Sequence, residues 1–324
     1  MRERCGITAL AIAVGAIAAL AAAAPIWTYA LSLAVFGVPH VLVELRYVDE
    51  RFAARLPRST LCWLGLGLGA IVAGRVLGLA EIGSGPNRVV AELVIGAGLV
   101  AAAVPMLARR GSLAVALLLL ALLLSGAAFA PLPTLVGLTL LHNLTPVGFL
   151  AERLDGRARR RALRSCLVVF GVVPALLLAG AFDAAIGGIT ISPLADGPFG
   201  AGSLDANLPV FVPAPLLGTP FADRLFAAAA FLQCMHYAVV LGVLPRLGGG
   251  DARPGAVLPW PPRTIWAIAI GGIGLATAFA FASEFAGARG SYGVLAAVHA
   301  WLELPILVVA CGSTARLPAA LAAT

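Results

Sequence analysis

Lysine is absent from this chain, and charged residues of any kind are scarce. All 22 basic side chains are arginine, and charged residues make up only 11% of the 324 positions. Because soluble globular domains carry about a quarter charged residues, this composition excludes an ordinary soluble protein. The missing lysine also excludes a retinal bound as a Schiff base to a membrane lysine.

Long polar stretches and cysteine pairs are missing as well. No polar stretch is much longer than about 35 residues, whereas a small soluble domain needs roughly 50. The five cysteines are scattered and form no C-x-x-C pair. We therefore expect reduced thiols that act as small buried hydrophobic side chains.

The chain consists mainly of apolar sequence, with 61% hydrophobic residues and a mean hydropathy of +1.00. Apolar runs of about 20 residues, the length that crosses a bilayer, recur from one end to the other. They predict an all-α fold, a polytopic transmembrane helical bundle of about ten helices that forms a single domain over residues 1–324. The predicted spans are 6–24, 26–45, 59–80, 89–107, 112–128, 132–150, 163–185, 221–244, 264–282 and 292–309.

The arginines gather in short segments between these spans, which the positive-inside rule explains better than nucleic-acid binding does. With the first helix retained, arginine-rich and arginine-poor segments alternate at every turn. The alternation places both termini in the cytoplasm, and we expect the bacterial inner membrane as the location. The one long outer loop, 187–220, is rich in glycine, proline and aspartate. It is either a lid or an irregular cover on the bundle.

Two further charges, Arg75 and Glu92, lie within the third and fourth spans near their outer ends. We expect them to pair across the hairpin or to extend toward the interface, and in both cases to be structural.

All four histidines lie inside predicted spans: His40, His142, His236 and His299. Histidine at bilayer depth is costly unless it has a partner, so each position is a functional-site hypothesis. The four helices run in the same direction, and their histidines fall near the middle of the membrane within the error of the boundaries. Each alone could be a hydrogen-bonded packing residue, but together they predict ligands that converge on a metal.

Carboxylates and prolines accompany these histidines. Glu44 follows His40 by four residues and Glu303 follows His299 by four, so each pair shares one helix face. Such a carboxylate can bind the metal or accept the second ring N–H of the histidine. Tyr237, directly after His236, is a further candidate for a catalytic role. Pro39, Pro146 and Pro305 lie near three of the histidines and are expected to bend the helices around a cavity.

Four neutral imidazoles suit iron, copper, zinc or nickel, and the nearby carboxylates favour iron. Gly37-Val38-Pro39-His40 also resembles the G-[IL]-P-H start of the first conserved motif of the Brp/Blh family, membrane carotene dioxygenases that make retinal. The resemblance implies a helical membrane bundle and a histidine-bound iron with His40 as a ligand. The chain departs from the family in having Val41 where glycine is usual, Glu44 as the nearest acid, and no paired histidines on one late helix.

Three functions remain open from the sequence. The first is a non-haem Fe²⁺ oxygenase that acts with dioxygen on a lipophilic, carotenoid- or lipid-like substrate taken from the membrane lipids. The second is electron transfer through b-type haem bound by the same histidines. The third is a transporter that moves a metal ion or protons, although no broken-helix repeat supports it.

Overall fold

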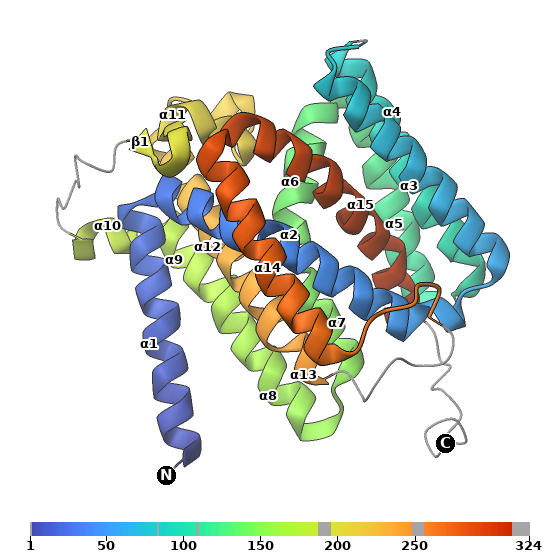
Figure 1. Ribbon diagram of the computed structural model, residues 1–324, viewed down its shortest axis with the longest axis horizontal. Helices are drawn as coiled ribbons and strands as arrows, with labels where there is room; N and C mark the ends of the chain where they lie inside the picture. Colours follow the sequence, from blue (N-terminus) through green and yellow to red (C-terminus); the bar gives the residue numbers. More distant parts are fainter. Residues whose placement is uncertain (1, 83, 108–109, 187–195, 248–255, 313–324) are drawn as a thin grey trace. The chain divides into compact units, whose positions relative to one another are not determined.

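The computed structural model describes residues 2–82, 84–107, 110–186, 196–247 and 256–312, and nearly all of them are helical (Figure 1). The helices of the first half are α1 (Arg2–Ala23), α2 (Pro25–Phe52), α3 (Arg58–Leu79), α4 (Gly85–Ala103), α5 (Arg110–Phe129), α6 (Pro131–His142) and α7 (Thr145–Arg153). Those of the second half are α8 (Gly156–Leu167), α9 (Val173–Leu178), α10 (Ala181–Ile186), α11 (Leu204–Asn207), α12 (Pro220–Gly242), α13 (Leu244–Leu247), α14 (Arg263–Ser283) and α15 (Phe285–Gly312).

Within the described residues, eight helices are long and apolar enough to cross a membrane, or nine if the bent pair of α6 and α7 counts as one span. The described apolar part of α1, Leu10–Ala23, is shorter. All ten predicted spans coincide with helices, which confirms an all-α membrane bundle. The chain is therefore an integral membrane protein.

Three predicted boundaries were wrong for identifiable reasons. Helix α2 continues through the charged link to Phe52, and the basic segment expected to be a loop is helical from Gly156. Arginine and alanine are good helix formers, so polarity alone does not end a helix. The sixth predicted span is broken after His142, with a bend of 41° between α6 and α7.

The outer loop was predicted to lack regular structure. Residues 187–195 lie outside the described part. The rest includes a small antiparallel hairpin of β1 (Asp196–Gly197) and β2 (Gly202–Ser203), followed by the short helix α11. Asn207 stabilises this segment, because its side-chain amide donates to the carbonyls of Ala201 and Ser203.

The chain divides into two compact units. The first contains residues 1–47, 136–252 and 260–296, and the second contains residues 48–135, 253–259 and 297–324. The boundaries between the units fall inside α2, α6 and α15, so each of these helices contributes residues to both. The prediction of a single domain stays a prediction.

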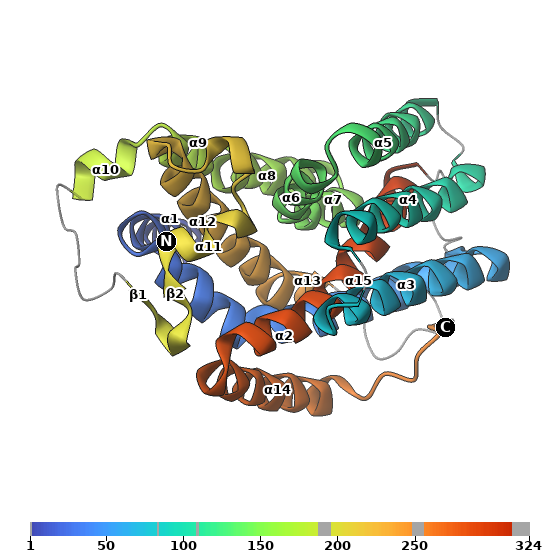
Figure 2. The same cartoon turned by 90° about the horizontal axis from the view of Figure 1, so that it is seen from above.

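In the first unit, α2 lies between α12 and α14 (Figure 2). The Gln233 amide on α12 donates to the Ser32 hydroxyl at 2.8 Å, a polar contact of the kind that joins helices in membranes. On the other side, Thr277 donates to the Ala34 carbonyl at 3.1 Å. Gly274 allows the close approach of α14, since a Cβ there would lie 3.2 Å from the Val35 carbonyl oxygen. These contacts fix the α2 segment that carries His40.

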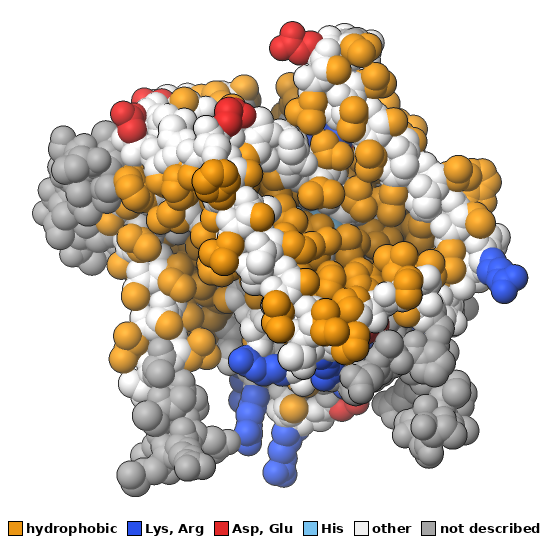
Figure 3. Space-filling view, viewed as in Figure 1, with side chains coloured by type: hydrophobic (Ala, Val, Ile, Leu, Met, Phe, Trp, Pro, Cys, Tyr) orange, Lys and Arg blue, Asp and Glu red, His pale blue; other side chains and the backbone are white. Residues whose placement is uncertain are grey.

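The outer surface of α14 is apolar, as expected of a helix that faces lipid. Ile268, Leu275 and Phe279 are each more than 70% exposed, and Figure 3 shows hydrophobic side chains along this helix. In water such a surface would be unfavourable, whereas in hydrocarbon it is the normal exterior.

In the second unit, α3, α4 and α5 pack side by side (Figure 1). The predicted pairing of the two intramembrane charges is confirmed, because Arg75 donates to both carboxylate oxygens of Glu92 at 2.7 and 2.6 Å. The Trp301 indole N–H donates to the same carboxylate at 2.7 Å. This partly buried network joins α3, α4 and the later part of α15.

Candidate metal centre

His40 is positioned by the helix that carries it. Its Nδ1 lies 3.0 Å from the Phe36 carbonyl oxygen, one turn earlier on α2. Because a carbonyl oxygen only accepts hydrogen bonds, Nδ1 is the nitrogen that bears the proton in this contact. The lone pair is then on Nε2, which is the arrangement required of a histidine that binds a metal through Nε2.

His142 is the last residue of α6, and the sequence after it explains why the helix breaks there. Pro146 has no N–H to donate to the His142 carbonyl, four residues earlier. The Thr145 hydroxyl takes over this bond at 2.9 Å, and the Asn143 side chain donates to the Thr139 carbonyl at 3.2 Å. The break is therefore satisfied by neighbouring side chains.

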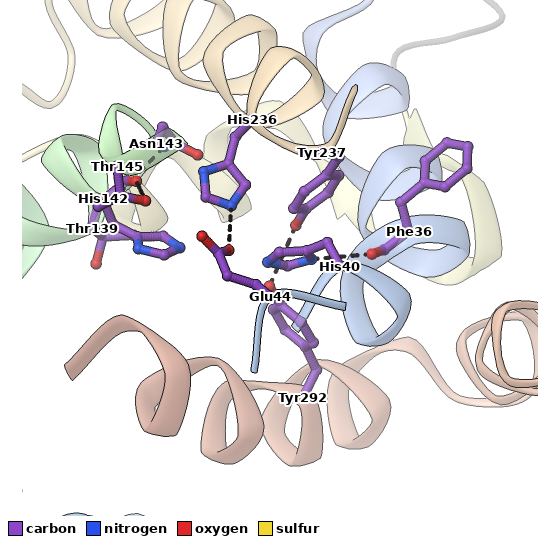
Figure 4. Close-up of polar contacts among 10 residues, drawn as sticks. All are labelled: Phe36, His40, Glu44, Thr139, His142, Asn143, Thr145, His236, Tyr237 and Tyr292. Atoms are coloured by element: carbon purple, nitrogen blue, oxygen red, sulfur yellow. Dashed lines mark hydrogen bonds and ion pairs between the residues drawn. The ribbon is translucent and has the colours of Figure 1, made fainter. Parts of the chain in front are cut away.

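His236 lies on α12 and is fully buried. Its ring centroid is 4.7 Å from that of His142 and 5.2 Å from that of His40. Each of the three histidines offers a ring nitrogen, and these nitrogens all lie within 4.8 Å of one another. Figure 4 shows the three rings, from α2, α6 and α12, directed toward one region together with Glu44.

Glu44 is buried on α2, one turn beyond His40. Its Oε2 is 3.4 Å from Nε2 of His236. This separation is longer than the 2.7–2.9 Å of a charge-assisted hydrogen bond. The carboxylate is thus beside the imidazoles without a tight direct bond to His236, and a cation between them would interact with both.

Two tyrosines border the group. The ring of Tyr237 lies 4.1 Å from that of His40, centroid to centroid, and its hydroxyl is 3.3 Å from the hydroxyl of Tyr292. The sequence pointed to Tyr237 because it follows His236, but Tyr292 was missed. A possible signal was its position on α15, seven residues before His299 and therefore nearly in phase with it on the helix.

His299 and Glu303 are both buried on α15, with ligand atoms within 4.8 Å of each other. They belong to the second unit, whereas His40, Glu44, His142, His236 and Tyr237 belong to the first. The structure brings the members of the first set together, and the place of His299 and Glu303 beside them stays a prediction from the sequence.

Three neutral imidazoles and a carboxylate in apolar surroundings are a suitable donor set for a transition metal. Nitrogens bound at about 2.1 Å from one ion lie roughly 3.0–3.4 Å apart. The upper limit of 4.8 Å for the three histidine nitrogens is compatible with such a site after small side-chain rotations.

Comparison with family models, with curated proteins and with solved structures finds no match to this chain. Its function is therefore inferred from the residues of the site.

Proposed function

We propose that this chain is an integral-membrane oxygenase that holds a non-haem iron ion through His40, His142 and His236. The observation that carries the proposal is the mutual approach, within 4.8 Å, of one ring nitrogen from each of these three histidines. His40 and His236 are buried and His142 is half-buried. Imidazoles at membrane depth are costly unless they have partners, so a close group of three is by default a functional-site hypothesis.

Iron is favoured over a purely structural metal because oxygen and nitrogen donors are combined. Sites with histidine and carboxylate ligands and open positions are typical of non-haem Fe²⁺ oxygenases. Glu44 would supply the carboxylate, either to the ion or to a ring N–H. The proposal keeps two expectations from the sequence, namely that His299 is a further ligand and that Glu303 supports it.

The substrate would be a lipophilic molecule that enters from the membrane together with dioxygen. The apolar surroundings of the site would exclude water from the reaction, which protects reactive species. The resemblance of Gly37-Val38-Pro39-His40 to the Brp/Blh motif is consistent with a carotenoid-like substrate. When bound, the iron would supply oxygen activation, while the residues of the chain hold the ion and orient the substrate.

A b-type haem fits the geometry less well. Two axial histidine nitrogens lie about 4 Å apart, on opposite sides of the macrocycle. A third nitrogen within 4.8 Å of both would fall inside the porphyrin ring. The close triangle of His40, His142 and His236 therefore favours a compact ion.

The proposal predicts about one iron per chain in protein purified in detergent, measured by elemental analysis. We expect His236→Gln and His142→Gln each to lower iron affinity at least tenfold, since even residues that only support a metal ligand cost about 10–100-fold. Arg224→Gln is the matched control, because Arg224 lies on the same helix, α12, and forms an exposed ion pair with Asp183 instead. The control should keep its iron.

Several results would contradict this assignment. If both histidine variants contained as much iron as wild type, His142 and His236 would not be iron ligands. A Soret band in the wild-type spectrum would favour haem. Iron uptake into vesicles, with no iron retained by the purified protein, would favour a transporter.

We also propose the bacterial inner membrane as the location, with both termini in the cytoplasm. The proposal follows from the arginine-rich segments at 46–58, 109–110 and 153–164, which the positive-inside rule places on the cytoplasmic side. Reporter fusions after the basic segment of α8 and within 196–219 should report cytoplasm and periplasm, respectively. The reverse pattern would overturn this orientation.

A further inference from the structure

The start of α8 carries an unusual arrangement of charge. Arg157, Arg160, Arg161 and Arg164 follow the spacing i, i+3, i+4, i+7. On an α-helix this spacing confines them to an arc of about 100°, so they form one stripe, here called the arginine stripe. The side chains of all four are exposed.

Within the helix itself this arrangement is unfavourable. Like charges three and four residues apart repel each other by a few tenths of a kcal/mol per pair. Cations in the first turns of a helix also oppose its macrodipole. Among the described residues, no carboxylate forms an ion pair with Arg157, Arg160 or Arg164. Arg157, Arg160 and Arg164 are therefore suited to an anion that comes from outside the chain.

The position of the stripe indicates which anion. Gly156 is the first residue of a candidate membrane span that continues to Leu178. Leu167 and Val168 follow Arg164 by three and four residues, so they extend the same face, and they are 67% and 51% exposed. Further along the span, Val172 and Leu176 are also exposed. From the start of the span toward its middle, this face thus presents guanidinium groups and then an apolar surface. A phospholipid has the same order, with its charged headgroup at the membrane surface and its acyl chains in the interior.

We propose that the arginine stripe and the apolar face that follows it bind an anionic glycerophospholipid of the surrounding bilayer. The guanidinium groups would contact the phosphate, for which arginine has a matching set of donors. The acyl chains would lie along Leu167 and Val168. The positive-inside rule accounts for many arginines on one side of the membrane, but it does not require them to share one helix face.

The test is a lipid titration of the full-length protein in detergent, followed by native mass spectrometry. Phosphatidylglycerol and phosphatidylcholine are the two probes. The wild-type protein should retain phosphatidylglycerol in preference to phosphatidylcholine. Because each arginine near a membrane surface contributes about a fivefold factor in affinity, Arg160→Gln/Arg164→Gln should bind phosphatidylglycerol roughly 30-fold more weakly.

The matched control is Arg159→Gln/Arg58→Gln. It removes the same charge from exposed positions, and Arg159 points away from the stripe. The affinity of the control for phosphatidylglycerol should fall by less than about threefold. An equal loss in the two double variants would mean that net charge alone is responsible and would overturn the proposal.

Two further outcomes would also overturn it. The first is binding of phosphatidylcholine as strong as that of phosphatidylglycerol. The second is complete competition by millimolar inorganic phosphate, which would indicate a site for free anions. If the stripe double variant does not fold, the adjacent single variants Arg160→Gln and Arg159→Gln are compared instead. A larger loss of affinity for phosphatidylglycerol in Arg160→Gln supports the proposal, and equal losses contradict it.

Discussion

Thr145 shows how one hydroxyl group can hold a histidine in place. Its Oγ1 donates to the carbonyl of His142, which Pro146 leaves without a backbone donor. Thr145→Val keeps the shape of the side chain but removes the donor. We expect a loss of about 1 kcal/mol in the free energy of unfolding, and a lower affinity for iron because the end of α6 is less well fixed. Thermal unfolding in detergent and iron analysis would measure both.

Thr145→Ser is the control for this substitution, since serine retains the hydroxyl. It should behave like wild type in both measurements. Equal behaviour of the valine and serine variants would show that the bond to His142 contributes nothing.

For single residues, the sequence identified the group of histidines but not the contacts that orient them. The apolar runs around His40, His142 and His236 were sufficient to place all three inside helices. The bond from His40 to the Phe36 carbonyl depends on a side-chain rotamer, and the approach of Tyr292 to Tyr237 depends on two helices far apart in the sequence. The bond of His40 has no sequence signal, and for Tyr292 the sequence indicates only that it lies nearly in phase with His299 on one helix.

At the scale of one helix, α4 depends on a glycine at its contact with Trp301. A Cβ at Gly96 would collide with the indole ring of Trp301, whereas a Cβ at Gly98 would meet no atom within 4 Å. We therefore expect Gly96→Ala to destabilise the protein by about 1–3 kcal/mol through overpacking. Gly98→Ala should be neutral or should stabilise it by about 0.5–1 kcal/mol. Thermal unfolding of the two variants, two positions apart in one helix, would give the comparison, and similar unfolding temperatures would refute it.

The ion pair between α3 and α4 is also testable. Glu92→Gln should lower the free energy of unfolding by about 1–3 kcal/mol. The reason is that Arg75, which is partly exposed and lies within a membrane-spanning helix, loses its counter-charge. Replacing both residues by methionine should restore much of this loss, since the unpaired charge is then removed as well. If the loss of the double methionine variant equals the sum of the losses of Arg75→Met and Glu92→Met, the two residues are not coupled and this expectation is wrong.

The elements that the sequence predicted well are those with long apolar runs. All ten runs are helices, because a backbone in hydrocarbon must satisfy its own hydrogen bonds. The errors arose at helix ends. There, Pro146 broke a run that hydropathy alone treated as continuous, and arginine-rich sequence extended α8 beyond its apolar part.

Across the whole chain, a membrane-embedded group of candidate metal ligands is combined with surfaces that face lipid. The three histidines proposed as ligands come from helices distant in sequence, α2, α6 and α12, so the proposed centre can form only when the first unit is folded. The sequence indicated the convergence from chemistry alone. The distances between the rings required the structure, because depth along a helix does not determine which face points inward.

The most direct test of the iron centre is X-ray absorption at the iron K-edge of the purified protein. We predict nitrogen or oxygen neighbours at about 2.0–2.2 Å, with the outer-shell scattering pattern of several imidazoles. In His236→Gln this imidazole contribution should fall by one ligand, or the iron should be lost. An iron environment without imidazole, or wild-type protein that binds no iron at all, would contradict the proposed centre.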